Sequence, residues 1–157
     1  KNIKSKNLIC VSPDAGGIER TRGLAKKINV DLAIIDKRRP QAGKSEVMNI
    51  IGEVKNKDCI IVDDIIDSGG TIVNAADALI KNGAKDVYVF ITHAVLSGEA
   101  INKIKKSKIK KLIITDSIDN SRRLKKVNKI HVLSIAQLMA EAIKRISNST
   151  SVSDLFN

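Results

Sequence analysis

Aromatic residues, cysteine and proline are scarce in this chain of 157 residues. Trp is absent, and the three aromatic side chains present, Tyr88, Phe90 and Phe156, offer no stacking platform for single-stranded nucleic acid or for an adenine ring. The two cysteines, Cys10 and Cys59, lie in separate apolar segments, which excludes a disulfide framework and a Cys-x-x-Cys site. No apolar run approaches the ~20 residues of a membrane span and no secretory signal is visible, so we expect a cytoplasmic protein that binds no membrane.

Basic side chains outnumber acidic ones by 28 to 17, which gives a net charge of +11. Such a balance favours polyanionic partners, but many of these residues are lysines in loops and on helix faces, where solvation explains them. With so few aromatic residues, we expect no nucleic acid among the partners. The length predicts a single domain over residues 1–157, large enough to build a core without disulfides or a structural metal.

Short apolar runs alternate with segments of helical periodicity along the chain. The runs are rich in β-branched residues and do not alternate with polar ones, which is typical of strands buried on both faces of a parallel sheet. They predict an α/β fold with a mainly parallel sheet flanked by helices. The expected strands are 8–11, 32–36, 59–62, 87–91, 112–115 and 130–133, and the expected helices are 16–28, 72–80, 99–105 and 134–146. The last helix has an apolar stripe that suits either the core or an interface.

The chain is organised around residues 59–71, where a strand leads through three acids into a glycine-rich turn and a helix. Residues 68–71 are small, so successive backbone N–H groups can converge on one anion at the helix N-terminus, helped by two hydroxyls. The carboxylates of Asp63 and Asp64 accept hydrogen bonds when ionised, which suits a vicinal diol or a hydrated magnesium ion. The segment therefore predicts a sugar-phosphate site at the carboxyl end of a central strand.

Each of these patterns also has a plainer interpretation. A Ser-Gly-Gly-Thr turn before a helix often serves as a tight connection with a Thr cap, and an acidic pair can be a solvated loop. Asp14 follows the first strand as the acids follow the central one, but an Asp there also caps the next helix. Residues 37–39 are three consecutive cations, which can neutralise charge in phosphoryl transfer or form a solvated turn before Pro40. From residue types alone these alternatives stay open.

Several segments together resemble one known family. Residues 62–71 (VDDIIDSGGT) resemble the phosphoribosyl pyrophosphate motif of the type I phosphoribosyltransferase fold. The flanking segments make the chain similar to ribose-phosphate pyrophosphokinases over essentially all of its length. These segments are 12–17 (SPDAGG), 36–40 (DKRRP), 46–52 (EVMNIIG) and 151–156 (SVSDLF).

The resemblance implies a phosphoribosyltransferase-like fold with a flexible catalytic loop. It also implies transfer of pyrophosphate from Mg-ATP to the anomeric hydroxyl of ribose 5-phosphate, which gives phosphoribosyl pyrophosphate and AMP for nucleotide biosynthesis. Lys37 would then have the principal catalytic role, Arg39 would contact the ribose phosphate or the transition state, and Asp14 would bind Mg²⁺. Ribose 5-phosphate would be bound by Arg39 and by Asp63, Asp64, Asp67, Ser68, Gly69, Gly70 and Thr71.

The resemblance further implies partners beyond this chain. Family members have two tandem domains, so we expect a missing amino-terminal half, which would supply a metal-binding His and part of the ATP pocket. A homo-oligomer, a hexamer by resemblance, is expected, with residues 148–157 as a tail that docks on another domain or subunit. Two alternatives remain. The chain can be a catalytically silent ribose-phosphate-binding or regulatory fragment. The chain can also be a phosphoribosyltransferase, but residues 37–39 and the tail argue against this alternative.

Overall fold

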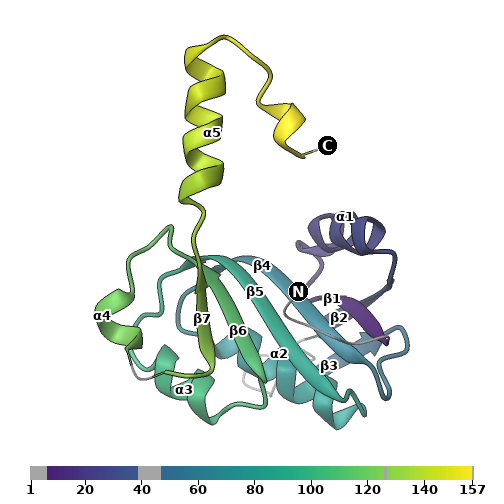
Figure 1. Cartoon of the computed structure of the whole chain (residues 1–157). Coiled ribbons are helices and arrows are strands. Elements are labelled where there is room, and N and C mark those ends of the chain that lie inside the picture. The colour runs from purple at the N-terminus through teal and green to yellow at the C-terminus, as the bar shows by residue number, and fades with distance from the viewer. Residues whose placement is uncertain (1–6, 39–46, 126, 157) are drawn as a thin grey trace.

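The computed structural model describes residues 7–38, 47–125 and 127–156, which form an alternating series of strands and helices (Figure 1). In chain order these are β1 (Leu8–Ser12), α1 (Ile18–Ile28), β2 (Asp31–Arg38), β3 (Val47–Ile51), β4 (Asp58–Ile66), α2 (Gly70–Lys81), β5 (Asp86–Ala94), α3 (Ala100–Lys106), β6 (Lys111–Thr115), the single-turn α4 (Ser121–Leu124), β7 (Ile130–Leu133), α5 (Ala136–Ser147) and the 3-10 helix η1 (Ser153–Phe156).

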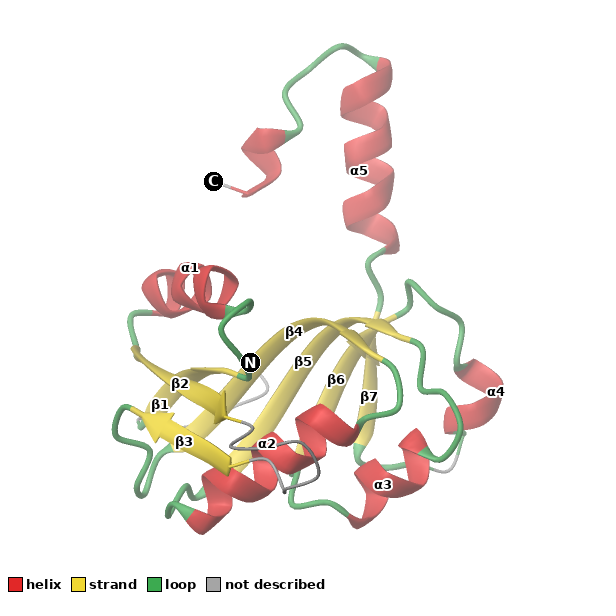
Figure 2. Ribbon diagram, turned by 180° about the vertical axis from the view of Figure 1, so that it is seen from behind, coloured by secondary structure: helices red, strands yellow, loops and turns green. Residues whose placement is uncertain are grey.

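The strands form one seven-stranded sheet in the order β3-β2-β1-β4-β5-β6-β7. Every neighbouring pair is parallel except β2 and β3, which are antiparallel. Helix α1 covers one face of the sheet, and α2 and α3 cover the other (Figure 2). The predicted α/β fold with a mainly parallel sheet is confirmed, and β4 lies at its centre.

Side chains of the central strand alternate between two cores of unequal size. Cys59 and Ile61 are fully buried in the larger core, where α2 packs, whereas Ile60 joins the smaller core beneath α1. The prediction of a strand buried on both faces is therefore confirmed. Burial also raises the pKa of the Cys59 thiol to about 12 and that of Cys10 to about 11, so both stay neutral at physiological pH.

Three strands extend two or more residues beyond their predicted ends. The sequence predicts that β2 ends at residue 36, β4 at residue 62 and β5 at residue 91, but the strands continue to Arg38, Ile66 and Ala94. In β2 the backbone is held by antiparallel pairing with β3, which aligns Lys37 with Met48. In β4 it is held by β5, which aligns Ile65 with His93. Pairing with a neighbouring strand thus outweighs the polar character of these segments. The rest of the predicted catalytic loop, residues 39–46, lies outside the described residues.

Helix α5 projects away from the sheet instead of packing on it (Figure 1). None of its residues is buried, and Ile143 and Ile146 are 62% and 67% exposed. Of the two uses predicted for its apolar stripe, the core is therefore excluded within the described part of the chain. The tail turns back towards α1, where Lys27 Nζ donates a hydrogen bond to the Phe156 carbonyl oxygen over 2.5 Å. Among the described residues, no helix combines the length and apolarity that crossing a bilayer requires.

Candidate functional site

The turn between β4 and α2 presents unpaired backbone N–H groups. Helix α2 begins at Gly70, and its N-cap is Gly69 in a left-handed conformation with φ of +77°. No side chain caps this end, and Thr71 lies inside the first turn. The interpretation of the turn as a connection with a Thr cap is therefore wrong. Since the first N–H groups of a helix have no partner within it, those of α2 are available to an anion.

A single cavity joins this turn to the acids predicted from sequence. It has a volume of about 270 Å³ and lies at the carboxyl ends of β1 and β4. Asp14 comes from the loop after β1, and Asp63 from the carboxyl-terminal part of β4. The lining residues are Asp14, Asp63, Ile65, Ile66, Asp67, Ser68, Gly69, Gly70, Thr71 and Ile72. The structure thus brings together seven of the predicted site residues in one cavity. Asp64 is not among the lining residues, but it directly follows Asp63 in β4.

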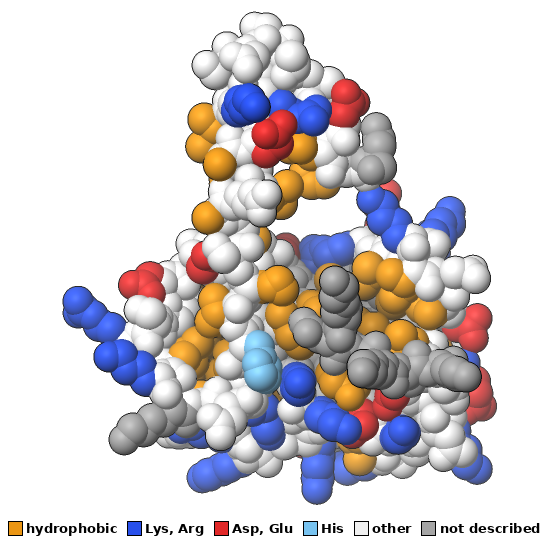
Figure 3. Space-filling view, viewed as in Figure 1, with side chains coloured by type: hydrophobic (Ala, Val, Ile, Leu, Met, Phe, Trp, Pro, Cys, Tyr) orange, Lys and Arg blue, Asp and Glu red, His pale blue; other side chains and the backbone are white. Residues whose placement is uncertain are grey.

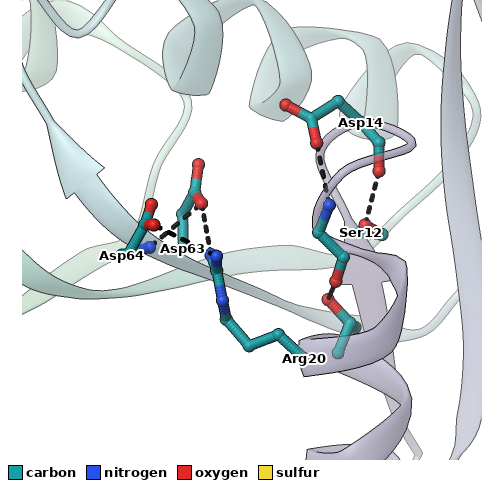
Figure 4. A network of polar contacts seen from close by, with 7 residues as sticks. Ser12, Asp14, Arg20, Asp63 and Asp64 are labelled. Atoms are coloured by element: carbon teal, nitrogen blue, oxygen red, sulfur yellow. Dashed lines mark hydrogen bonds and ion pairs between the residues drawn. The ribbon is translucent and has the colours of Figure 1, made fainter.

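Asp14 stabilises the turn before α1 and lines the cavity. Its Oδ1 accepts a hydrogen bond of 3.0 Å from the backbone N–H of Gly17, the N-cap residue of α1, although the helix has no side-chain cap. Ser12 fixes the same loop by donating its hydroxyl to the Asp14 carbonyl oxygen over 2.7 Å (Figure 4). Because Asp14 also lines the cavity, this hydrogen bond fixes the position of a carboxylate at the cavity.

The acid pair is held by a cation from α1. Arg20 Nη1 lies 2.5 Å from Asp63 Oδ1, and Nη2 lies 3.2 Å from Asp64 Oδ2, so one guanidinium bridges both carboxylates (Figure 4). Burial raises the pKa of Asp63, against the effect of the Arg20 hydrogen bond. The pKa of Asp64 is lowered, because its hydrogen bond with Asp63 and the charge of Arg20 outweigh slight burial. Asp64 is therefore the more firmly ionised of the two.

Sequence reasoning treats Arg20 only as a polar residue of the first helix and misses this contact. The available signal is positional, since the helix that follows Asp14 starts at the same edge of the sheet as Asp63. Lys103 of α3 is a second missed cation, with Nζ 3.4 Å from the Ser68 carbonyl oxygen. It adds positive charge beside the turn.

The donor set for a magnesium ion is small. Among the described residues there is no group of three or more His, Cys, Asp or Glu side chains that could hold a metal ion. Mg²⁺, however, usually binds through one or two carboxylates and keeps waters or substrate phosphates as its other ligands. The Asp14 carboxylate at the cavity fits that mode.

The side chains of the two predicted catalytic cations, Lys37 and Arg39, lie outside what the structure describes. Lys37 is the second-last residue of β2, and its backbone pairs with Met48, but its side chain lies outside what the structure describes. Arg39 lies wholly outside the described residues. Their predicted roles stay predictions.

Comparison with known proteins settles the family. A model of the phosphoribosyl synthetase-associated domain matches residues 39–157, which is most of the chain. The chain belongs to this family. The predicted resemblance to ribose-phosphate pyrophosphokinases is confirmed by relatives of that name. The relative from Rhizobium meliloti is 53% identical over 157 residues, which is all of this chain and 51% of the relative. The relative from Fusobacterium nucleatum is 52% identical over the same length and is covered to 49%.

A solved member of the family has the same fold. The crystal structure of phosphoribosylpyrophosphate synthetase from Mycobacterium smegmatis matches with a TM-score of 0.82 at 35% identity. The match covers 91% of this chain and 46% of that protein. The chain therefore spans about half the length of the relatives that it matches, and the division into domains stays a prediction.

Proposed function

We propose that this chain provides the ribose 5-phosphate site of a ribose-phosphate diphosphokinase, which transfers pyrophosphate from Mg-ATP to the anomeric hydroxyl and releases AMP. The observation that carries the proposal is the shared cavity, in which a turn suited to a phosphate lies beside Asp63, which Arg20 joins to Asp64 in a carboxylate pair suited to a diol. Family membership supports the same reaction class.

Each part of the cavity would bind a different part of the sugar phosphate. The phosphate would accept hydrogen bonds from the backbone N–H groups of residues 68–71 and from the hydroxyls of Ser68 and Thr71. The ring hydroxyls would donate to Asp63 and Asp64. Binding at both ends would fix the anomeric hydroxyl relative to the nucleotide, and such positioning removes much of the barrier of a two-substrate reaction.

Charge on the transferred group would be neutralised by cations. Asp14 would hold Mg²⁺, which would supply positive charge to the phosphates of ATP. Lys37 and Arg39 would add charge from the end of β2 and the residues beyond it. No covalent intermediate with the chain is required.

Replacing Lys37 tests the catalytic proposal. We expect Lys37→Ala to lower the rate of AMP release from ATP and ribose 5-phosphate by a factor of about 10² or more, because removing a charge-stabilising group costs that much in comparable sites. Binding of ribose 5-phosphate, measured by calorimetry, should stay unchanged. Arg38→Ala is the matched control, since the family resemblance gives this neighbour no role, and it should keep its rate. Equal rates for Lys37→Ala and the unmodified chain would remove Lys37 from the mechanism.

The length of the chain favours a second candidate function, a fragment that binds ribose 5-phosphate without catalysis. Because the chain spans about half of its relatives, it can bind ribose 5-phosphate without turning it over. The same two measurements separate the candidates, since a silent binding fragment gives a calorimetric signal with ribose 5-phosphate and no AMP with any variant.

The exposed apolar surface supports a further partner. Hydrophobic side chains are visible on α5 and over the sheet face below it (Figure 3). Phe90, Ile113 and Leu133 line an apolar hollow of about 200 Å³ on this face. Since the relatives are about twice as long as this chain, we propose that an amino-terminal half covers the hollow and α5. A homo-oligomer built from such pairs is part of the same proposal.

A further inference from the structure

The guanidinium of Arg20 is the described cation that pairs with Asp63 and with Asp64. It reaches across from α1 to the acid pair on β4, and its side chain is 38% exposed (Figure 4). The two-pronged shape of guanidinium matches two neighbouring carboxylates, which a single ammonium cannot bridge in the same way.

The acid pair needs such a partner if it is to bind a neutral sugar. Adjacent carboxylates repel each other, and the side chains of Asp63 and Asp64 are close enough to interact directly. Without a cation between them they would move apart or share a proton, and either change would remove acceptors from the site. Arg20, bound to both, holds the two carboxylates together and favours their ionised forms.

The contacts also determine which oxygen atoms remain for a ligand. Asp63 Oδ1 accepts from Arg20 and, over 3.0 Å, from the Asp64 backbone N–H. Asp64 uses Oδ2 for Arg20. Arg20 therefore contacts one oxygen of each carboxylate and leaves Asp63 Oδ2 and Asp64 Oδ1 on the side that it does not cover. Two acceptors on adjacent residues match the two hydroxyls of a vicinal diol.

Arg20 is not required to attach α1 to the sheet. The helix packs through Ala25 onto Cys10 and Ile60, which form the smaller core. Its start is fixed by Asp14 and by the Thr21 hydroxyl, which donates to the Gly17 carbonyl oxygen over 2.8 Å. Partly exposed ion pairs add little to stability. A purely structural role therefore leaves the two-pronged contact at the cavity unexplained.

We infer that Arg20 is a positioning residue, which holds Asp63 and Asp64 so that the oxygen of each that Arg20 does not contact receives a hydroxyl of the ribose diol. This inference rests on the proposed function and adds a determinant of specificity to it. Arg20 acts on the sugar only through the two carboxylates, and the phosphate is bound elsewhere in the cavity. Removing Arg20 should therefore affect recognition of the diol and not of the phosphate.

The test compares three ligands by calorimetry with the 157-residue chain: ribose 5-phosphate, 2-deoxyribose 5-phosphate and inorganic phosphate. We expect the unmodified chain to bind ribose 5-phosphate about tenfold or more tightly than the deoxy compound, because a hydroxyl bonded to a charged acceptor is lost. Arg20→Gln should reduce this preference to about threefold or less and leave phosphate affinity within about twofold. Arg20→Lys, which retains the charge but bridges the pair less well, should show an intermediate preference.

Arg22→Gln is the matched control, since Arg22 is an exposed arginine of the same helix, and it should behave as the unmodified chain. Full retention of the ribose preference in Arg20→Gln would overturn the inference. If circular dichroism shows that this variant is unfolded, Arg20→Lys decides, and full preference there has the same meaning. Failure of the unmodified chain to bind ribose 5-phosphate would instead refute the proposed function itself.

Discussion

Gly69 determines the shape of the turn that is proposed to bind phosphate. Its φ of +77° lies in the left-handed region, which costs an L residue about 1–2 kcal/mol. A methyl group at this position would also lie 3.8 Å from Ala100 of α3, in contact with the helix behind the turn. Gly70 is different, because it begins α2 in ordinary helical conformation and an added methyl group would meet no atom within 4 Å.

These two neighbours make a matched pair of variants. We expect Gly69→Ala to lower the free energy of unfolding by about 1–2 kcal/mol and to weaken phosphate binding, because the turn must distort. Gly70→Ala should change the free energy of unfolding by less than about 0.5 kcal/mol, since alanine favours a helix and has room there. Urea unfolding and phosphate titration measure both effects. Equal unfolding free energies for the two variants would show that the left-handed turn is not needed.

Helices α2 and α5 have similar apolar periodicity and different environments. In α2 the apolar residues Ile72, Ala75, Ala76 and Leu79 are buried against the sheet. In α5 no residue is buried, and Leu138, Met139, Ile143 and Ile146 are exposed. Periodicity shows that a helix has an apolar face but not what covers that face. We propose that the exposed stripe is covered by the partner half of the longer enzyme.

Substitutions on α5 should impair binding of a partner, whereas a substitution in α2 should lower the free energy of unfolding. The double variant Ile143→Lys with Ile146→Lys should keep the free energy of unfolding within about 0.5 kcal/mol of the unmodified chain, since both side chains are mostly exposed. It should no longer bind an amino-terminal half supplied as a separate chain, as measured by sedimentation. Leu79→Ala is the contrasting variant and should lose about 2–5 kcal/mol, because it leaves a cavity in the core. Retained binding by the double lysine variant would contradict the proposed interface.

Elements that depend on neighbouring residues in the chain can be predicted from the sequence, whereas features that depend on contacts between distant residues cannot. Unbroken apolar runs predict the central strands, and Gly83, with φ of +86°, ends α2 as its position predicts. The ends of β2 and β4 depend on hydrogen bonds to neighbouring strands, so they extend past the residues that local composition indicates. The contact of Arg20 with Asp63 joins residues 43 positions apart and appears only once the fold is known.

At the scale of the whole molecule, the sheet brings the site together. β1 and β4 are parallel neighbours, so the loop containing Asp14 and the segment 63–71 meet at one edge. The sequence predicts these residues one by one, because each follows an apolar strand. The side chains of Lys37 and Arg39 lie outside the described residues, and about half of the relatives' length lies outside this chain. The proposed function therefore depends most on the described part of the site, where we propose that one turn binds a phosphate and two acids bind its sugar.

A crystal structure of the chain with ribose 5-phosphate tests this claim most directly. We expect the phosphate oxygens to lie within about 3.2 Å of the backbone nitrogens of residues 68–71, and two sugar hydroxyls to lie within the same distance of Asp63 and Asp64. Arg20 should remain on the far side of the two carboxylates. A ligand bound elsewhere on the chain, or bound with its sugar turned away from the acid pair, would contradict the account.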